Sequence, residues 1–394
     1  MQEKNDILSY IKNLIINQEL DKTEIYQEIF GETVAYDTAR KQLKGIENFI
    51  NLVEDGCEFS DSKIEQKIRE LQVERIKLQT EKSEYNRQLR EQTRADMTEE
   101  KIVAAIRDIS KNIKVEKIKP ITPKKNDVAM VLGKADMHYG AEFKILDLVG
   151  NILNEYSPEI FEDRMWKVLS ELVNYAEKNN INEVTIFNLG DDIEGILHIS
   201  QLLILRYGMI DSVIHLAAFL TKWILTLATH MRVNYKIVRG NHSDARILTG
   251  KKGDFPHENL SKIIVWHLQT LVREKDVPNV TVQGYNEEGN VYCNINGFDI
   301  LAVHGHNESS NLAKSLKDYI MLYSKNNIDY LFAGHLHSGL SEEVCKNKEV
   351  IRFPSIMGGN DYSVFHKKIS NAGAKILLFE KNIGITDEHR IILK

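Results

Sequence analysis

The chain has 394 residues, enough for two or three domains with a sizeable hydrophobic core in at least one of them. Its hydrophobic content of 42% and charged content of 27% are those of a soluble globular protein, and a net charge of −6 excludes a polycation that coats nucleic acid indiscriminately. The cysteines Cys57, Cys293 and Cys345 are widely spaced. This spacing argues against a disulfide framework or a cysteine zinc site and fits a reducing cytoplasm.

Residues 1–56 have apolar side chains at helical spacing and predict three short helices. A tight turn before the last helix resembles a helix-turn-helix module. In that case a helix near residues 36–45 would enter a DNA groove with Arg40, Lys41 and Lys44 near phosphates. Acidic residues outnumber basic ones here, whereas DNA readers are usually basic. A protein-docking or purely structural unit therefore remains the alternative.

Residues 57–110 predict a long helix that can form a coiled coil. Residues 61–95 contain neither Gly nor Pro, and apolar side chains recur every seven positions. A second row, offset by four, places Arg75 and Lys82 at core positions, which weakens a long zipper. Self-association and a single solvated helix are both open, and residues 1–110 are also a candidate surface for a partner protein. The first row is Ile64, Leu71, Leu78 and Tyr85.

Residues 111–126 predict an extended linker, because this short stretch is rich in lysine and contains Pro120 and Pro123. The remaining residues, 127–394, form the predicted catalytic domain. Its most apolar stretch is residues 196–231, in which charged residues interrupt every run long enough to span a membrane. The stretch is either a pair of buried helices or a dimer interface. We expect a cytoplasmic oligomer with no membrane association.

Five short segments that carry histidine, aspartate or asparagine recur in this domain, most of them directly after an apolar, β-branched run. Such runs predict buried strands. Polar ligands placed just past several strand ends indicate one metal site assembled from distant parts of the chain. The segments are Asp136-Met137-His138, Gly190-Asp191, Gly240-Asn241-His242, Val303-His304-Gly305 and Gly334-His335-Leu336-His337.

These segments offer imidazole, carboxylate and amide donors but no thiolate. Such a set suits manganese, iron, zinc or nickel better than calcium or magnesium, and we expect manganese. Seven donors exceed the needs of one tetrahedral site and predict two adjacent divalent ions. The predicted ligands are Asp136, His138, Asp191, Asn241, His304, His335 and His337.

The order D-x-H, GD, GNH, H, GHxH resembles the calcineurin-like metallophosphoesterase family over roughly residues 127–370. The resemblance implies a β-sandwich flanked by helices. With the helices predicted for residues 1–110, the expected chain is α/β with an all-α N-terminal region. It also implies a dinuclear centre that activates water to hydrolyse a phosphoester. One ion would be held by the residues at Asp136, His138, Asp191 and His337, and the other by those at Asp191, Asn241, His304 and His335. His242 matches a histidine that is not a ligand and protonates the leaving oxygen or steadies the phosphate.

The chain departs from the family pattern after Gly-Asn-His. The family usually has an acidic residue directly there, which orients the histidine, whereas this chain has Ser243 followed by Asp244. We expect one of these two to take that role. His306 and Asp192 are further candidates for substrate contact or for support of the ligands.

The resemblance leaves the substrate open. The helix-turn-helix-like module, the lysine-rich linker and the apolar stretch after the GD motif favour a DNA nuclease, similar to repair nucleases of the SbcD type. The modular plan resembles that of phage and prophage DNA-metabolism proteins. The alternatives are a small-nucleotide or cyclic-dinucleotide phosphodiesterase, a phosphoprotein phosphatase, and a DNA- or protein-binding regulator without activity.

Overall fold

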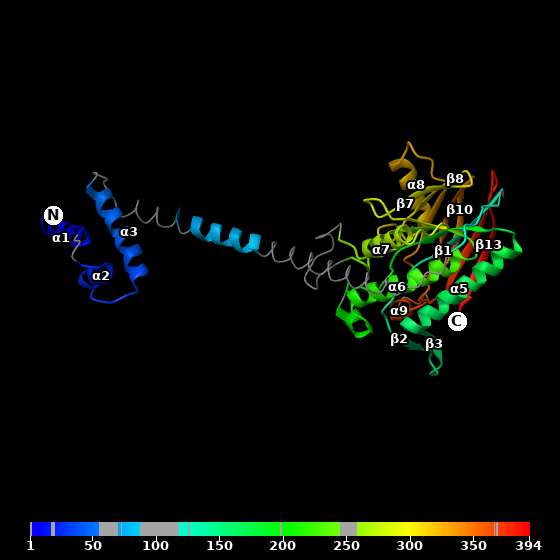
Figure 1. Ribbon diagram of the computed structural model, residues 1–394, viewed down its shortest axis with the longest axis horizontal. Helices are drawn as coiled ribbons and strands as arrows, with labels where there is room; N and C mark the ends of the chain where they lie inside the picture. Colours follow the sequence, from blue (N-terminus) through cyan, green and yellow to red (C-terminus); the bar gives the residue numbers. More distant parts are fainter. Residues whose placement is uncertain are drawn as a thin grey trace. The chain divides into compact units, whose positions relative to one another are not determined.

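The computed structural model describes residues 2–16, 20–54, 70–71, 73–86, 118–124, 127–197, 199–244, 258–365, 367 and 369–394. The chain divides into two compact units, Met1–Ala95 and Asp96–Lys394, and each is described by itself (Figure 1).

The first unit contains the three helices that the apolar spacing predicts. The Asp21 side chain caps the second helix by accepting hydrogen bonds from the backbone of Thr23 and Glu24, and Gly31 (φ 73°) ends it in the left-handed region. Apolar side chains from all three helices form one small core, which includes Ile15, Ile25 and Leu43. The helices are α1 (Gln2–Ile16), α2 (Lys22–Phe30) and α3 (Tyr36–Glu54).

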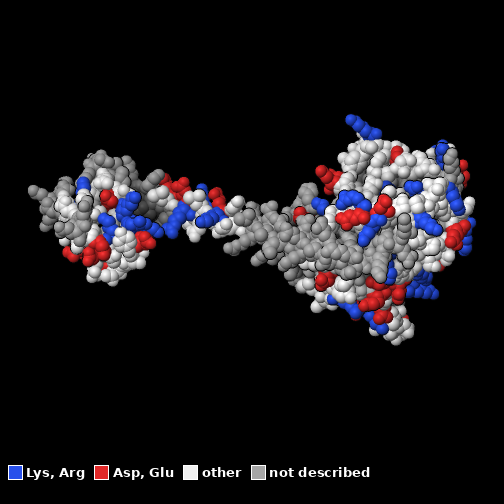
Figure 2. Space-filling model, in the orientation of Figure 1, with Lys and Arg blue, Asp and Glu red and all other residues white. Residues whose placement is uncertain are grey.

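The exposed face of α3 carries cationic side chains. Leu43 is buried, whereas Arg40, Lys41 and Lys44 are exposed. Arg40 lies 3.7 Å from Asp37, one turn earlier on the same helix. Basic and acidic side chains are mixed on the face of this unit that Figure 2 shows. The cations of α3 are therefore accessible, but they do not stand in a purely basic surface.

Residues 73–86 are helical, in agreement with the predicted long helix. Leu71, Leu78 and Tyr85 lie on the first heptad row, and 56%, 62% and 65% of their respective surfaces are exposed. Ile64 lies outside the described residues, as do residues 57–69 and 87–110 of the predicted coiled coil. The described part of the row is thus an exposed apolar face.

In the second unit, alternate side chains of a strand pack into different hydrophobic cores. On the first strand of the domain, Met130 and Leu132 belong to the core that contains the long helices, whereas Val131 belongs to a second core between two sheets. Because successive side chains of a strand point to opposite faces of the sheet, both faces of this strand are buried. A third core lies between Leu331 of the other sheet and Leu316 of a covering helix. The layers are therefore helices, sheet, sheet and helix, which confirms the predicted β-sandwich flanked by helices.

The sheets place the carboxyl ends of their parallel strands at one edge. In the larger sheet β1, β4, β5 and β6 run parallel, and in the smaller one β8, β9 and β11 do. The larger sheet has the order β13 (Gly384–Leu393), β12 (Ala372–Glu380), β1 (Val128–Lys134), β4 (Glu183–Asn188), β5 (Arg232–Ile237), β6 (Val280–Gln283). The smaller has the order β10 (Leu340–Cys345), β11 (Lys348–Arg352), β9 (Tyr330–Ala333), β8 (Phe298–Ala302), β7 (Val291–Ile295).

Helices cover the outer faces of the sandwich, and a two-stranded hairpin extends from it (Figure 1). The larger sheet is covered by α5 (Pro158–Lys178), α6 (Met209–Ala228) and α7 (Ser261–Glu274). The smaller is covered by α8 (Leu312–Leu322). The hairpin consists of β2 (Phe143–Leu146) and β3 (Ile152–Tyr156), and the short elements are η1 (Ile199–Leu203) and α9 (Asp361–Phe365).

The apolar stretch 196–231 forms one long α-helix and a single 3₁₀ turn, η1, where a pair of buried helices was one of the two predictions. By length and composition α6 could cross a membrane, but 61% of its most apolar window is buried in the protein. Trp223 is fully buried and donates a hydrogen bond from Nε1 to the backbone oxygen of Met165 on α5. This helix is therefore part of the hydrophobic core.

Residues 118–124 of the predicted linker are attached to the catalytic domain. The Ile121 backbone N–H donates to Asn279 Oδ1, and the Asn279 amide donates back to the Lys119 oxygen. Asn182 exchanges two hydrogen bonds with the segment in the same way, accepting from Lys124 and donating to Thr122. Residues 119–124 of the predicted linker are thus hydrogen-bonded to Asn182 and Asn279 of the catalytic domain.

Candidate metal centre

The five sequence segments meet where strands of both sheets end. Asp136 and His138 follow β1, Asp191 follows β4, and Asn241 follows β5 in the larger sheet. The remaining histidines follow β8 and β9 of the smaller sheet. Parallel strands bring their carboxyl ends to one edge, so the sandwich gathers side chains that are far apart in the sequence.

Several site residues have strained backbones. Asp136, His138, Asp191, His335 and His337 all have positive φ angles, between 43° and 68°. This left-handed conformation is uncommon outside glycine and costs of order 1–3 kcal/mol per residue at such positions. Five such residues in one place indicate that the surrounding fold holds these side chains in positions required for function.

Two glycines allow the segments to approach closely. A Cβ atom at Gly240 would lie 2.0 Å from the Asp191 backbone nitrogen, and one at Gly195 would lie 1.8 Å from the His242 oxygen. Real Cβ atoms do not approach other atoms so closely. Any larger residue at either position would push the third segment away from the second.

Three overlapping groups of side chains can each hold a metal ion, because their ligand atoms lie within 4.8 Å of one another. Asp191 belongs to two of them, so it is the carboxylate best placed to be shared. The groups are Asp136, His138 and His337; His138, Asp191 and His242; and Asp191, His304 and His335. The fold therefore brings together every histidine and aspartate among the predicted ligands.

Backbone carbonyls orient two of the histidines. His304 Nδ1 lies 2.7 Å from the Leu189 oxygen, and His337 Nδ1 lies 3.2 Å from the Gly358 oxygen. A nitrogen that contacts a carbonyl must carry the proton, so Nε2 of each ring is left as the acceptor for a metal ion. His304 Nε2 is 2.9 Å from Asp191 Oδ2, and His337 Nε2 is 3.9 Å from Asp136 Oδ1.

Asn241 Oδ1 supports the presence of a metal in this site. It is buried, and no hydrogen-bond donor contacts it among the described residues. An unpaired buried carbonyl oxygen costs about 1–3 kcal/mol, and a cation would satisfy it. His138 Nε2 is also buried without a hydrogen-bond partner in the described part of the chain. The donors present thus fit a divalent cation, and the fit does not distinguish manganese from iron, zinc or nickel.

Burial and charge set the protonation of the site. Burial lowers the pKa of both His335 and His337 to about 3, so both rings are neutral and able to bind a metal ion. Burial alone would raise the pKa of Asp191, but His304 and other nearby histidines hold it well below its usual value. Burial opposes the charged form of His304, yet the Asp191 carboxylate raises its pKa to about 9. A cation that binds between these two groups therefore displaces a proton.

Glu194 is a site residue that the sequence motifs did not reveal. Its buried carboxylate lies 2.7 Å from His138 Nδ1 and 3.2 Å from His242 Nδ1. Burial would raise the pKa of Glu194, but the two histidines lower it to about 2. The same contact raises the pKa of His138 to about 9 against the effect of burial. Glu194 is thus an ionised support for both rings, and its position three residues after Asp191 was the available signal.

Gln201 on η1 supports the same pair. Its Nε2 donates to Glu194 Oε1 over 2.7 Å and lies 3.3 Å from His242 Nδ1. Its Oε1 accepts a hydrogen bond from the Leu197 backbone. The side chain therefore links the short helix after the second motif to the histidine of the third.

The expectation that Ser243 or Asp244 orients His242 is corrected by these contacts. Asp244 lies 2.7 Å from Arg239 and accepts a hydrogen bond from Asn259, while Ser243 is buried with no hydrogen-bond partner for its hydroxyl among the described residues. The serine inserted after His242 places the next acidic side chain beside Arg239. The carboxylate that contacts His242 is that of Glu194, three residues after Asp191.

Asp192 and His306, the two other candidates for substrate contact or ligand support, lie in different surroundings. Asp192 is fully buried and accepts hydrogen bonds from Ser261 and Asn188, so it braces the fold behind the site and does not face substrate. The His306 ring lies 5.5 Å from that of His304 and 6.3 Å from that of His335. His306 therefore borders the cluster and stays a candidate for substrate contact.

The loop that follows β11 also supports the site. Ser355 donates a hydrogen bond to the backbone oxygen of Asp136 and accepts one from the Gly358 backbone. Because the Gly358 oxygen contacts His337, this loop connects the first motif with the last.

Comparisons with known proteins agree with this geometry. A family model described as calcineurin-like phosphoesterase matches residues 130–339, and one described as YonJ coiled-coil domain matches residues 67–109. The SPbeta prophage-derived uncharacterized protein YonJ of Bacillus subtilis (strain 168) is 31% identical over 386 residues, which cover 95% of this chain and 92% of the relative. The prophage relative fits the predicted phage-type architecture.

Solved structures also align with the chain. Zn²⁺-complexed Vps29 from Entamoeba histolytica is 13% identical, and the alignment covers 67% of this chain and 99% of that one with a TM-score of 0.30. A dimetal phosphatase from Danio rerio is 9% identical, covering 68% and 99% of the two chains with a TM-score of 0.33. The family model, which covers more than half of the chain, and the prophage relative decide the assignment. The chain belongs to the calcineurin-like phosphoesterase family.

Proposed function

We propose that the protein is a divalent-metal-dependent phosphodiesterase that cleaves DNA. The observation that carries the proposal is the cluster of carboxylate, imidazole and amide donors around Asp191, at the meeting point of both sheets. Asp136, His138, Asp191 and His337 would hold one ion. Asp191, Asn241, His304 and His335 would hold the other. Bound ions would lower the pKa of a water molecule and offset the charge of the phosphodiester.

In this proposal His242 supplies the proton that the leaving oxygen needs. Its Nδ1 faces Glu194 and Gln201, so Nε2 is the nitrogen available to substrate. The Glu194 carboxylate, 3.2 Å from this Nδ1, holds the ring in place. Because His138 contacts the same carboxylate, the proton donor and a metal ligand share one support.

DNA as the substrate is supported by the N-terminal unit. Arg40, Lys41 and Lys44 lie on the exposed face of α3, where they can contact phosphates. The acidic side chains of the same unit limit the electrostatic attraction to DNA. The unit would therefore contribute only part of the DNA affinity, and the catalytic domain would carry out the hydrolysis.

A substrate panel tests the proposal. We expect the manganese-reconstituted protein to hydrolyse bis-p-nitrophenyl phosphate and labelled DNA. A protein without residues 1–95 should retain the first activity, because the whole metal cluster lies in the second unit. Its KM for DNA should rise, and the salt dependence of binding should become shallower by about 0.7–0.9 for each phosphate that is no longer bound.

The same panel contains the outcomes that would contradict the proposal. Rapid turnover of a cyclic dinucleotide or a small nucleotide, with DNA left intact, would identify a small-molecule phosphodiesterase. Turnover of p-nitrophenyl phosphate and phosphopeptides alone would identify a phosphatase. Equal DNA affinity and salt slope with and without residues 1–95 would show that the N-terminal unit has another partner.

We also propose that the chain self-associates through its coiled-coil region, because Leu71, Leu78 and Tyr85 form an exposed apolar row. Light scattering should give at least twice the 45.3 kDa mass of one chain at micromolar concentration. A variant with Leu71→Glu and Leu78→Glu should shift toward the monomer, whereas Glu74→Gln and Glu81→Gln on the same helix should not. A monomeric wild-type chain would refute self-association.

A further inference from the structure

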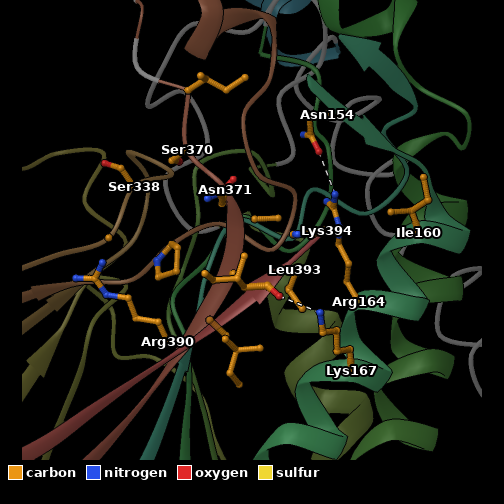
Figure 3. Close-up of a pocket in the computed structure, with 18 of the residues that line it drawn as sticks. Asn154, Ile160, Arg164, Lys167, Ser338, Ser370, Asn371, Arg390, Leu393 and Lys394 are labelled. Atoms are coloured by element: carbon orange, nitrogen blue, oxygen red, sulfur yellow. Dashed lines mark hydrogen bonds between the residues drawn. The ribbon is translucent and has the colours of Figure 1, made fainter. Parts of the chain in front are cut away.

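A cavity of about 1040 Å³ has a mixed lining of apolar, polar and cationic side chains, none of them a candidate metal ligand (Figure 3). It is formed by β3, the first half of α5, the start of β12 and the end of β13, elements that none of the five motifs includes. Ser338, which directly follows His337, lines it as well. The cavity therefore begins one residue from the metal cluster.

The wall between the cavity and the cluster is made of residues that support His337. Ser370 lines the cavity and donates its hydroxyl hydrogen to the His337 backbone oxygen. Asn154, on the β3 side, donates to the oxygens of Met357 and Gly359, the two neighbours of Gly358. Since the Gly358 oxygen contacts His337 Nδ1, a ligand in this cavity would contact residues that hold a candidate metal ligand in place.

The charge of the cavity is positive. Five cationic side chains line it, Arg164, Lys167, Lys375, Arg390 and Lys394, against the two carboxylates Glu155 and Asp163. Some of this charge is offset nearby, because Glu388 lies 3.0 Å from Lys375 and 3.2 Å from Arg390.

Arg164 and Lys167 are not offset in this way. Arg164 is 5% exposed, and its hydrogen bonds go to the backbone oxygens of residues 155, 356 and 357 and to Asn154 Oδ1, all of them neutral acceptors. Lys167 donates to the Ile392 oxygen. Within the described ranges, no carboxylate lies within ion-pair distance of either side chain. A buried guanidinium without a counter-charge makes the cavity floor attractive to anions.

None of the described residues that line the cavity is aromatic. A site that recognises a nucleobase usually offers an aromatic surface on which the base stacks. Hydroxyl, amide and cationic groups instead match the oxygens of phosphates and sugars. The aliphatic residues of the lining carry no such specificity, so its polar and cationic groups make the cavity better suited to a sugar-phosphate backbone than to a free nucleoside.

We propose that this cavity binds backbone phosphates of the nucleic-acid strand next to the phosphodiester that is cleaved. The inference rests on the proposed DNA substrate and adds to it the path of the strand, from the metal cluster past Ser338 and Ser370 toward Lys167 and Arg390. The exposed Lys167 and Arg390 contact phosphates, while Arg164 holds the wall and supplies a fixed positive field.

The test reverses two charges in the full-length protein. The variant Lys167→Glu with Arg390→Glu should hydrolyse bis-p-nitrophenyl phosphate within about twofold of wild type, because neither side chain belongs to the metal cluster. Its KM for single-stranded DNA should rise at least about tenfold at 0.1 M salt, and the slope of log affinity against log salt should fall by about 0.7 for each phosphate that the variant no longer binds.

The matched control is Arg273→Glu with Lys275→Glu, the same pair of charge changes on exposed residues at the far end of α7. This control should leave the KM for DNA and the salt slope unchanged. Thermal melting of both variants separates loss of binding from loss of fold.

Two outcomes overturn the inference, and they are distinguishable. If wild type cleaves DNA and the Lys167/Arg390 variant matches the control in KM and salt slope, the cavity is not part of the strand path, while the proposed function stands. If wild type turns over the chromogenic diester but neither binds nor cleaves DNA, the DNA substrate and the strand path fail together.

Discussion

The Asp191→Asn variant is expected to lose both bound metal and activity. The amide keeps nearly the same shape, and its oxygen can still accept the hydrogen bond that Asp191 Oδ1 now accepts from the His242 backbone over 2.8 Å. It removes the negative charge that two of the three candidate ligand groups share. We expect less than one metal ion per chain and a loss of at least about 10³-fold in hydrolysis of bis-p-nitrophenyl phosphate, since a bound cation contributes several kcal/mol to the transition state.

Metal content by mass spectrometry and the hydrolysis rate check this expectation. Asp211→Asn is the matched control, because Asp211 is exposed in the first turn of α6 and belongs to none of the ligand groups. Wild-type metal content together with wild-type turnover in Asp191→Asn would show that this carboxylate does not bridge two ions.

The His242→Ala variant is expected to retain its metal and lose rate. His242 Nδ1 is occupied by Glu194 and Gln201, and the adjacent Asn241 already offers an unpaired oxygen to a cation. A side chain that only transfers a proton contributes roughly 10²–10⁴-fold to the rate. We therefore expect unchanged metal content and a fall in kcat of that size, with a smaller effect on a substrate whose leaving group needs no proton.

The geometry also allows the opposite result, because His242 lies with His138 and Asp191 in one of the candidate ligand groups. Loss of a metal equivalent from His242→Ala would make this histidine a ligand and refute its role as a proton donor. His230→Ala is the control, since His230 is exposed at the end of α6, and it should alter neither the metal content nor the rate.

The sequence alone determined the candidate ligands and the strands that present them. Each motif follows an apolar run, and an apolar run between polar segments specifies a buried strand through local chemistry. Asp136 after β1 and His304 after β8 could therefore be assigned to strand ends from the order of residue types along the chain. The three helices of the first unit were also predictable, because caps such as Asp21 and Gly31 act within one turn.

The apolar stretch before the third motif shows where this kind of prediction ends. Its composition is suited both to a pair of buried helices and to a dimer interface. Only the packing of α6 against α5 shows that the domain itself covers this helix. Trp223 is buried there and hydrogen-bonded to the backbone oxygen of Met165. Burial of an apolar helix face depends on which segment packs against it, and the residues of that face do not specify this segment.

Only the tertiary structure shows which carboxylate supports His242 and that a cavity lies next to Ser338. Glu194 joins His138 and His242 from a segment between them in the chain, whereas the sequence after His242 predicted Ser243 or Asp244 for this role. The cavity is formed by β3, α5, β12 and β13, whose side chains share no motif. Local pattern determines which residues share a strand end or a helix face. Hydrogen-bond partners and cavities arise where distant segments pack together, so they follow only from the folded chain.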